Sequence, residues 1–225
     1  TGGITDSSNL SASGDVTLND VATAGITLGT LEADANVILT AAGNTAITND
    51  AALALQGTVT GTLAATATTG DITDSDALAV SGASVFTLGA DGTNITLDSA
   101  ANAFSGAVTL KAGSSGGQTF GNIVFVDSGA IDFDSAASAD GDLFLDGGTD
   151  NTVGGTLAVT ATTGGITDSA TIAVTGDLTL NDVATAGITL DTLEADANVI
   201  LTAAGNTAIT NDAALALQGA VTGTL

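Results

Sequence analysis

The sequence lacks several residue types that most protein sites need. Its 225 residues include no Cys, His, Pro, Met, Trp or Tyr. Without Cys and His, the usual ligand sets for structural zinc, haem and iron–sulfur clusters cannot be assembled. A Ser-His-Asp or Cys-His catalytic site is excluded for the same reason. We therefore expect no enzymatic activity and no required cofactor.

Positive charge is almost absent. Lys111 is the only cation beside 25 acidic residues, which gives a formal net charge of −24. A chain of this kind has no electrostatic means of binding nucleic acid, and anionic membranes should repel it. Divalent cations and cationic partners remain compatible with it. Residues 51–70 carry no charge, but Thr and Gly interrupt their apolar positions, so we expect no membrane insertion by this segment.

A long internal repeat dominates what is present. The segment at residues 15–63 recurs at residues 177–225 with only three differences. Residues 1–162 are therefore interpreted as one full long repeat and residues 163–225 as the start of the next. We expect residues 1–225 to form a single continuous solenoid that is a window of a longer tandem array.

Two shorter periods lie inside the long repeat. The segment GTLAATATTGDITDS at 61–75 resembles GTLAVTATTGGITDS at 155–169, which divides the long repeat into sub-repeats of about 1–68 and 69–162. Ile-Thr pairs begin at Ile4, Ile26 and Ile47, and related units follow, so each long repeat holds seven units of about 23 residues. We expect these three isoleucines to stack in one inward column, as equivalent residues of successive coils do.

The units have the pattern of strands. Apolar residues occupy every second place in DVTLND, NVILTA and LAVSG, and Gly, Asn, Asp and Ser mark the breaks. About three such runs fit in each unit, which predicts an all-β parallel β-helix with three short strands per coil. The main alternative is an antiparallel immunoglobulin-type sandwich, which would normally have larger core residues. At about 4.8 Å per coil, seven coils rise about 34 Å.

A family resemblance supports this fold. GTLAVTATTGGITDSATIAVTGDLTL and NITLDSAANAFSGAVTLKAG resemble the repeats of bacterial filamentous-haemagglutinin-like exoproteins and giant surface adhesins. The resemblance covers nearly the whole chain, and its motifs are degenerate strand-and-turn patterns. It implies a right-handed parallel β-helix that acts as a secreted stalk, adhesin or matrix fibre at the bacterial cell surface.

One segment is dense enough in carboxylates to suggest a metal. Calcium prefers six to eight oxygen ligands, which Asp side chains and loop carbonyls can supply. The EF-hand spacing is absent, and the alternative is a solvated loop at a wider coil. The calcium candidates are Asp127, Asp132, Asp134, Asp140, Asp142, Asp146 and Asp150.

Two other features have structural explanations. All six Phe residues lie between residues 86 and 144, where we expect them in a locally wider core rather than on a ligand platform. Thr-x-Thr triplets occur at residues 58–60, 66–68 and 160–162, too intermittently for an ice-binding face. We expect Lys111 to face solvent.

The sequence therefore predicts a structural extracellular repeat protein that forms a rigid stalk or fibre of a bacterial surface adhesin. The first alternative is a subunit of a self-assembling extracellular filament or sheath, and the second is a calcium-dependent adhesive module. The expected partners are further copies of the same repeat, in the same chain or in neighbouring chains.

Overall fold

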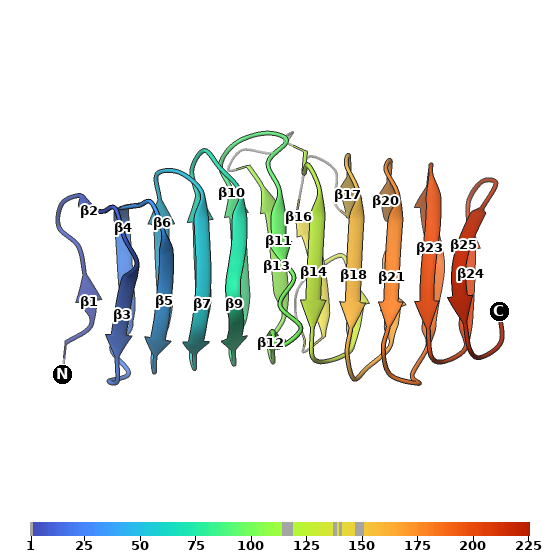
Figure 1. Ribbon diagram of the computed structural model, residues 1–225, viewed down its shortest axis with the longest axis horizontal. Coiled ribbons are helices and arrows are strands. Elements are labelled where there is room, and N and C mark those ends of the chain that lie inside the picture. Colours follow the sequence, from blue (N-terminus) through green and yellow to red (C-terminus); the bar gives the residue numbers. More distant parts are fainter. Residues whose placement is uncertain (1, 114–118, 137–138, 140, 147–150) are drawn as a thin grey trace.

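The chain folds into two long parallel β-sheets that face each other across one core (Figure 1). The computed structural model describes residues 2–113, 119–136, 139, 141–146 and 151–225. These residues contain strands, bends and turns but no helix, so none of them forms a helix that could cross a bilayer.

The chain passes back and forth between the two sheets, and in places it forms two or three successive strands in one sheet, as with β15 (Ile131–Phe133), β16 (Asp142–Asp146) and β17 (Thr152–Val153). Sheet B has eleven strands, which lie side by side in the order β3 (Val16–Asp20), β5 (Asn36–Ala41), β7 (Leu53–Val59), β9 (Ile72–Val80), β11 (Ile95–Leu97), β14 (Ile123–Asp127), β18 (Leu157–Ala161), β21 (Leu178–Asp182), β23 (Asn198–Ala203) and β25 (Ala216–Val221), with β12 (Ala103–Phe104) also on β9. Sheet A has fourteen strands, in the order β1 (Ile4–Thr5), β4 (Ile26–Ala33), β6 (Thr45–Asn49), β8 (Leu63–Ala67), β10 (Ser84–Leu88), β13 (Val108–Ala112), β16 (Asp142–Asp146), β15 (Ile131–Phe133), β19 (Ile166–Asp168), β22 (Ile188–Ala195), β20 (Ile172–Val174) and β17 (Thr152–Val153), with β2 (Leu10–Ala12) on β4 and β24 (Thr207–Asn211) on β22.

The pairings confirm a parallel β-solenoid. Each strand pair is parallel, and partner residues in neighbouring coils are typically about 21 positions apart, as in the pairing of Val16 with Val37. The widest coil of sheet B separates Ile123 from Leu157. The ten strands on the main path of sheet B correspond to ten coils. Hairpin pairing is absent from the described residues, so the antiparallel sandwich is wrong.

The predicted number of coils in the long repeat is confirmed. Val16 in β3 and Leu178 in β21 are equivalent residues of successive long repeats, and sheet B places seven strand steps between β3 and β21. Seven steps of about 4.8 Å give a rise of about 34 Å for each long repeat.

The predicted isoleucine column is wrong at its third member. Ile26 pairs with Ile4, but the next partner of Ile26 is Thr45, whereas Ile47 pairs with Leu28. The coil from Ile26 to Thr45 is shorter than the assumed period, so Ile47 lies two positions further along its strand. Because strand side chains alternate with a period of two, this shift keeps Ile47 in the core, 1% exposed.

The sub-repeats alternate between the two sheets. The first ITDS element begins at Ile4 in sheet A, the second at Ile72 in sheet B and the third at Ile166 in sheet A again. Each sub-repeat therefore spans about three and a half coils. Two sub-repeats together return the chain to the same sheet after a whole number of coils.

One cluster of aliphatic and aromatic side chains fills the solenoid from the first coils to the last. Five of the six Phe residues are buried in it, as predicted. Phe104 packs against Phe86 edge-to-face and against Phe125 in a stacked arrangement, with ring centroids 5.9 and 5.4 Å apart. Phe144 is the exception: it lies on the outer face of β16 and is only partly buried.

Candidate functional site

The acid-rich segment forms an irregular coil in the middle of the solenoid. β15 precedes β16 in the sequence, yet β16 lies between β13 and β15 in sheet A. The chain thus adds one strand to sheet A within a single coil of sheet B. This extra strand accounts for the wide separation in sequence between Ile123 and its partner Leu157.

The carboxylates near β14 and β15 accept hydrogen bonds from the protein. Asp127 is 3% exposed, and its carboxylate accepts the amide N–H groups of Phe104 at 2.9 Å and Gly129 at 3.2 Å. Asp132 lies on the outer face and accepts the hydroxyl groups of Thr167 at 3.1 Å and Ser169 at 2.6 Å. Asp127 thus ties one coil to the preceding one, and Asp132 ties its coil to the next.

The other described carboxylates of the segment also have protein partners. Asp134 accepts the amide N–H of Ser135 at 2.6 Å, and Asp142 accepts that of Ala139 at 2.5 Å. Asp146 forms an ion pair with Lys111, which lies on the outer face of β13. Lys111 is therefore at the surface, as expected, but it is paired with a neighbouring coil.

The structure does not gather the calcium candidates into one site where it describes them. Among the described residues, no three acidic side chains lie close enough together to hold a metal ion. Asp140 and Asp150 fall outside the described residues. Calcium binding stays a prediction, to be measured directly.

A second set of carboxylates, which the sequence analysis did not single out, forms bonds that recur along the chain. Asp6 of the first ITDS element accepts the amide N–H groups of Gly29 at 3.1 Å and Thr30 at 2.8 Å. Asp74 and Asp168, the corresponding residues of the other two elements, each accept two amide N–H groups of the next coil in the same way. The repeated ITDS motif was the signal that could have revealed this role.

Hydrogen bonding to these amides favours the charged carboxylate. The amide N–H of Gly29, followed by that of Thr30, lowers the pKa of Asp6 below its ordinary value of 3.8. The pKa of Asp91 is lowered in the same way, chiefly by the amide N–H of Thr119 at 2.8 Å. These aspartates are structural links between coils rather than groups poised to exchange protons at neutral pH.

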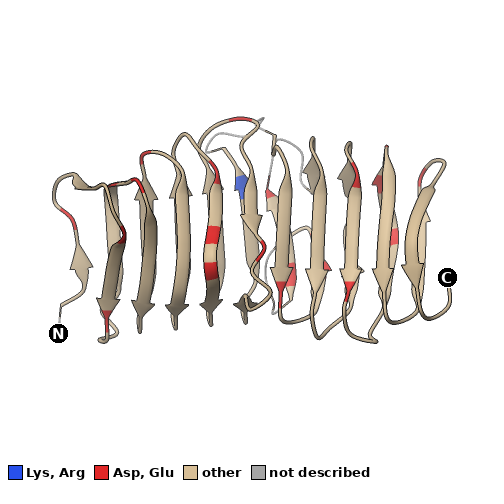
Figure 2. Ribbon diagram, viewed as in Figure 1, with Lys and Arg blue, Asp and Glu red and all other residues tan. Residues whose placement is uncertain are grey.

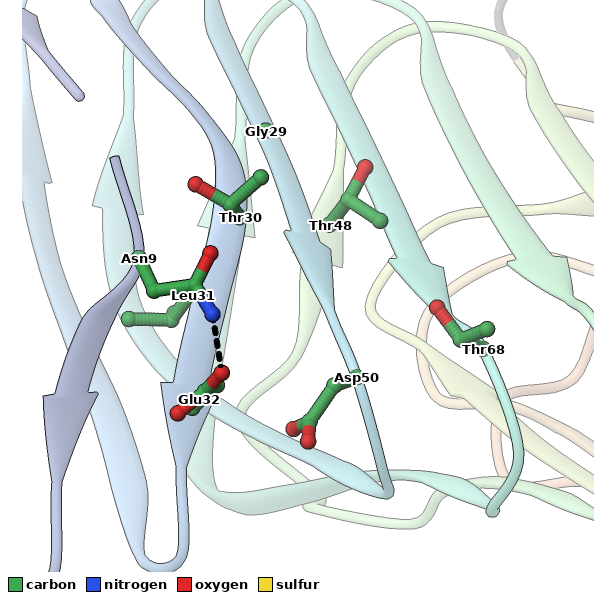
Figure 3. Close-up of a pocket in the computed structure, with 8 residues that line it drawn as sticks. All are labelled: Asn9, Gly29, Thr30, Leu31, Glu32, Thr48, Asp50 and Thr68. Carbon is green, nitrogen blue, oxygen red and sulfur yellow. Dashed lines mark hydrogen bonds between the residues drawn. The ribbon is translucent and has the colours of Figure 1, made fainter. Parts of the chain in front are cut away.

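A shallow groove recurs once in each long repeat. The first groove, of about 190 Å³, has Thr30, Glu32, Thr48 and Asp50 on its walls (Figure 3). In the close-up, the side chain of Asn9 donates a hydrogen bond to Glu32. The equivalent groove of the next long repeat has a volume of about 260 Å³ and is lined by corresponding residues, with Thr171 in place of Asn9 and Asp191 in place of Gly29. Both grooves present carboxylates and hydroxyls to solvent.

The comparisons with known proteins give a family and no function. The family described as repeats of unknown function (DUF5649) matches residues 42–111 and 120–203. No curated protein and no solved structure matches the chain.

Proposed function

Because the chain belongs to the DUF5649 family of repeats of unknown function, whose description specifies no activity, we propose a function from the architecture: the chain is a rigid segment of an extracellular stalk or fibre of a bacterial surface adhesin. A β-solenoid of repeats is typically a structural element, and we expect no catalysis here. The secreted location and the adhesin role come from the resemblance of the repeats to filamentous-haemagglutinin-like exoproteins.

The observation that carries the proposal is the unbroken stacking of coils around one core. Each coil contributes inward aliphatic side chains, and the ladder of each sheet continues through ten coils. The long repeat equals seven coils, so each further long repeat adds about 34 Å of the same rod. Added repeats make the rod longer without changing its cross-section, which suits a stalk that holds a binding tip away from a cell.

Electron microscopy of the source material tests the proposal. The expected result is a long thin fibre with an axial repeat of about 34 Å. Antibody against this chain should also label intact, unpermeabilised cells. Compact particles without an axial repeat, or labelling only after permeabilisation, would contradict the stalk function.

A further inference from the structure

The acidic side chains leave areas of the outer surface uncharged on both sheets. Figure 2 shows acidic residues at the bends and in β9, while the strands of sheet B on either side of β9 are largely free of colour. We use the name sheet B patch for the outward side chains of five consecutive strands, β14, β18, β21, β23 and β25. Asp127 and Asp182 are the only acidic residues in these strands, and both are buried at strand ends. Asp177, directly before β21, accepts hydrogen bonds from the backbone and side chain of Asn198 at the edge of the patch.

The sheet B patch presents small and β-branched side chains to solvent. Outward positions alternate with buried ones in β18, β21 and β23, whereas no residue of β25 is buried. The outward side chains of the patch are partly or fully exposed apart from Val126, which is 8% exposed. The outward side chains are Val124, Val126, Ala158, Thr160, Thr179, Asn181, Asn198, Ile200, Thr202, Ala216, Gln218 and Ala220.

A corresponding uncharged area lies on the opposite side of the rod. We use the name sheet A patch for the outward residues Thr27, Ala46, Ala64, Thr66, Val85, Thr87 and Thr109 of β4, β6, β8, β10 and β13. The groove that contains Glu32, Thr48 and Asp50 lies at its edge. Lys111, paired with Asp146, marks its border. Strand β8 in sheet A and strand β18 in sheet B are equivalent in the two sub-repeats, as residues 61–75 and 155–169 show. The alternation of sub-repeats thus puts matching patches on both sides.

Charge determines what can approach these patches. Two copies of a chain with a net charge of −24 repel each other wherever their acidic surfaces meet. The two patches are broad areas where flat sheets can meet without opposing like charges. We propose that the sheet A and sheet B patches are lateral contact faces between copies of this chain, so that one rod contacts a neighbour on each side. This inference rests on the proposed rod function and adds how rods assemble.

The area of each patch determines how strongly two copies of the chain should associate through it. Five coils at about 4.8 Å and five residues at about 3.3 Å give a patch of roughly 24 by 17 Å, or about 400 Å². A standard stable interface buries about 800 Å² per partner, so one patch should give only weak association. In an array the patch recurs every seven coils, and successive patches would then add to one another by multivalency.

The test is sedimentation velocity of the 225-residue chain at increasing NaCl concentration. Salt screens the repulsion between the acidic surfaces, since the Debye length falls from about 10 Å at 0.1 M to about 3 Å at 1 M. The unmodified chain should therefore associate more strongly as salt rises. Because each rod has two contact faces, the assemblies should grow past the dimer rather than stop there.

Paired substitutions separate the two faces. Thr160→Asp with Thr202→Asp adds two charges to one outer column of sheet B, two coils apart. Ala46→Asp with Val85→Asp does the same on sheet A. Either pair should weaken association about tenfold or more, and the four substitutions together should weaken it further.

The control pair adds the same charge away from the patches. Ser13→Asp with Thr175→Asp lies at exposed, equivalent bends and should assemble like the unmodified chain. If circular dichroism shows that the first sheet B pair fails to fold, Ala158→Asp with Ile200→Asp places the charges in the neighbouring outer column.

Three results would overturn the inference: a monomer at every salt concentration, face variants that assemble like the unmodified chain, or a bend variant that loses assembly equally. A chain that stays a monomeric rod would leave the stalk function intact.

Discussion

The side chain of Asn49 offers the sharpest test of how neighbouring coils are held together. It is 0% exposed, and its Oδ1 accepts the amide N–H of Ala33 at 2.8 Å. Its Nδ2 donates to the carbonyl groups of Ala33 at 3.1 Å and Ala52 at 2.6 Å. Asn49 therefore bridges the preceding coil and the bend that follows its own strand.

Asn49→Ala removes all three hydrogen bonds and leaves the Ala33 N–H buried without its partner. An unsatisfied buried polar group costs about 1–3 kcal/mol, so we expect the substitution to lower the free energy of unfolding by about 2–4 kcal/mol. Amide hydrogen exchange at Ala33 is the direct assay, because repeat arrays need not unfold in a single step. Its protection should fall roughly 30-fold or more.

The chain contains its own control. Asn211 occupies the same sequence context in the next long repeat but is partly exposed. Its Oδ1 accepts the amide N–H of Ala195 at 2.8 Å, as Asn49 does with Ala33, but its Nδ2 lies 3.4 and 3.5 Å from the carbonyls of Ala195 and Ala213. The two Nδ2 bonds are weak at this length, and water can reach the partly exposed side chain, so Asn211→Ala should cost about 1–2 kcal/mol, less than Asn49→Ala. Equal effects at the two positions would refute the argument, because burial would then not determine the cost.

Four further outcomes follow from the structure. Gly57 has a φ of +113°, and a Cβ there would lie 2.1 Å from the carbonyl oxygen of Leu39, so Gly57→Ala should lower the free energy of unfolding by about 2 kcal/mol or more. Gly29 has open space around it, so Gly29→Ala should be nearly neutral. Urea unfolding measures both effects. Phe125→Ala should cost about 3–5 kcal/mol in the same assay, because Phe125 is 2% exposed and stacks in the core. Asp6→Asn should lower stability above pH 3.8 but not well below it, because a carboxylate with a depressed pKa stabilises the fold only while it is ionised. Thermal melts of both proteins from about pH 2 to about pH 7 test whether the stability difference disappears in acid. Millimolar calcium should change the melting temperature little relative to a chelator.

Each of these outcomes can fail in a specific way. A neutral Gly57→Ala variant would mean that the two coils can separate at no cost at this position. A stability difference between Asp6→Asn and the unmodified chain that persists at pH 2 (about two units below the ordinary pKa) would show that Asp6 acts through packing rather than charge. A large rise in melting temperature with calcium would support the calcium-dependent adhesive module.

The sequence was sufficient for the fold class because two signals agree in every coil. Alternation of apolar and polar residues determines which side chains face inward, and the repeats show that successive units are equivalent. A shift of two positions in the strand register leaves each side chain on the same face of the sheet. The predicted core positions were therefore correct although the predicted partner of Ile47 was wrong. Register depends on the length of each coil, and coil length varies here without an obvious mark in the sequence.

The functional surface was harder to predict for a different reason. The acid-rich segment gives no periodic signal, so nothing in it shows that β16 returns to lie between β13 and β15. Composition indicated carboxylates that could meet at a metal, whereas the fold gives each described one a partner in the protein. The recurrent links made by Asp6 and Asp168 were visible only as a repeated motif, because the amides that they accept lie 23 to 24 residues further along the chain.

The half-integral number of coils in a sub-repeat has a structural consequence for the whole array. A duplication of three and a half coils preserves the core, because the inward faces of both sheets take the same kinds of aliphatic residue. It also turns every outward feature to the opposite side of the rod, as the equivalent strands β8 and β18 show. A unit with a whole number of coils would place all copies of a surface feature on one side of the rod, so that the rod would have a single contact face. The observed unit places them on alternate sides at intervals of about 17 Å, from three and a half coils at about 4.8 Å. Such a rod can contact neighbours on both sides at once, which a layer or bundle of fibres requires and a solitary stalk does not.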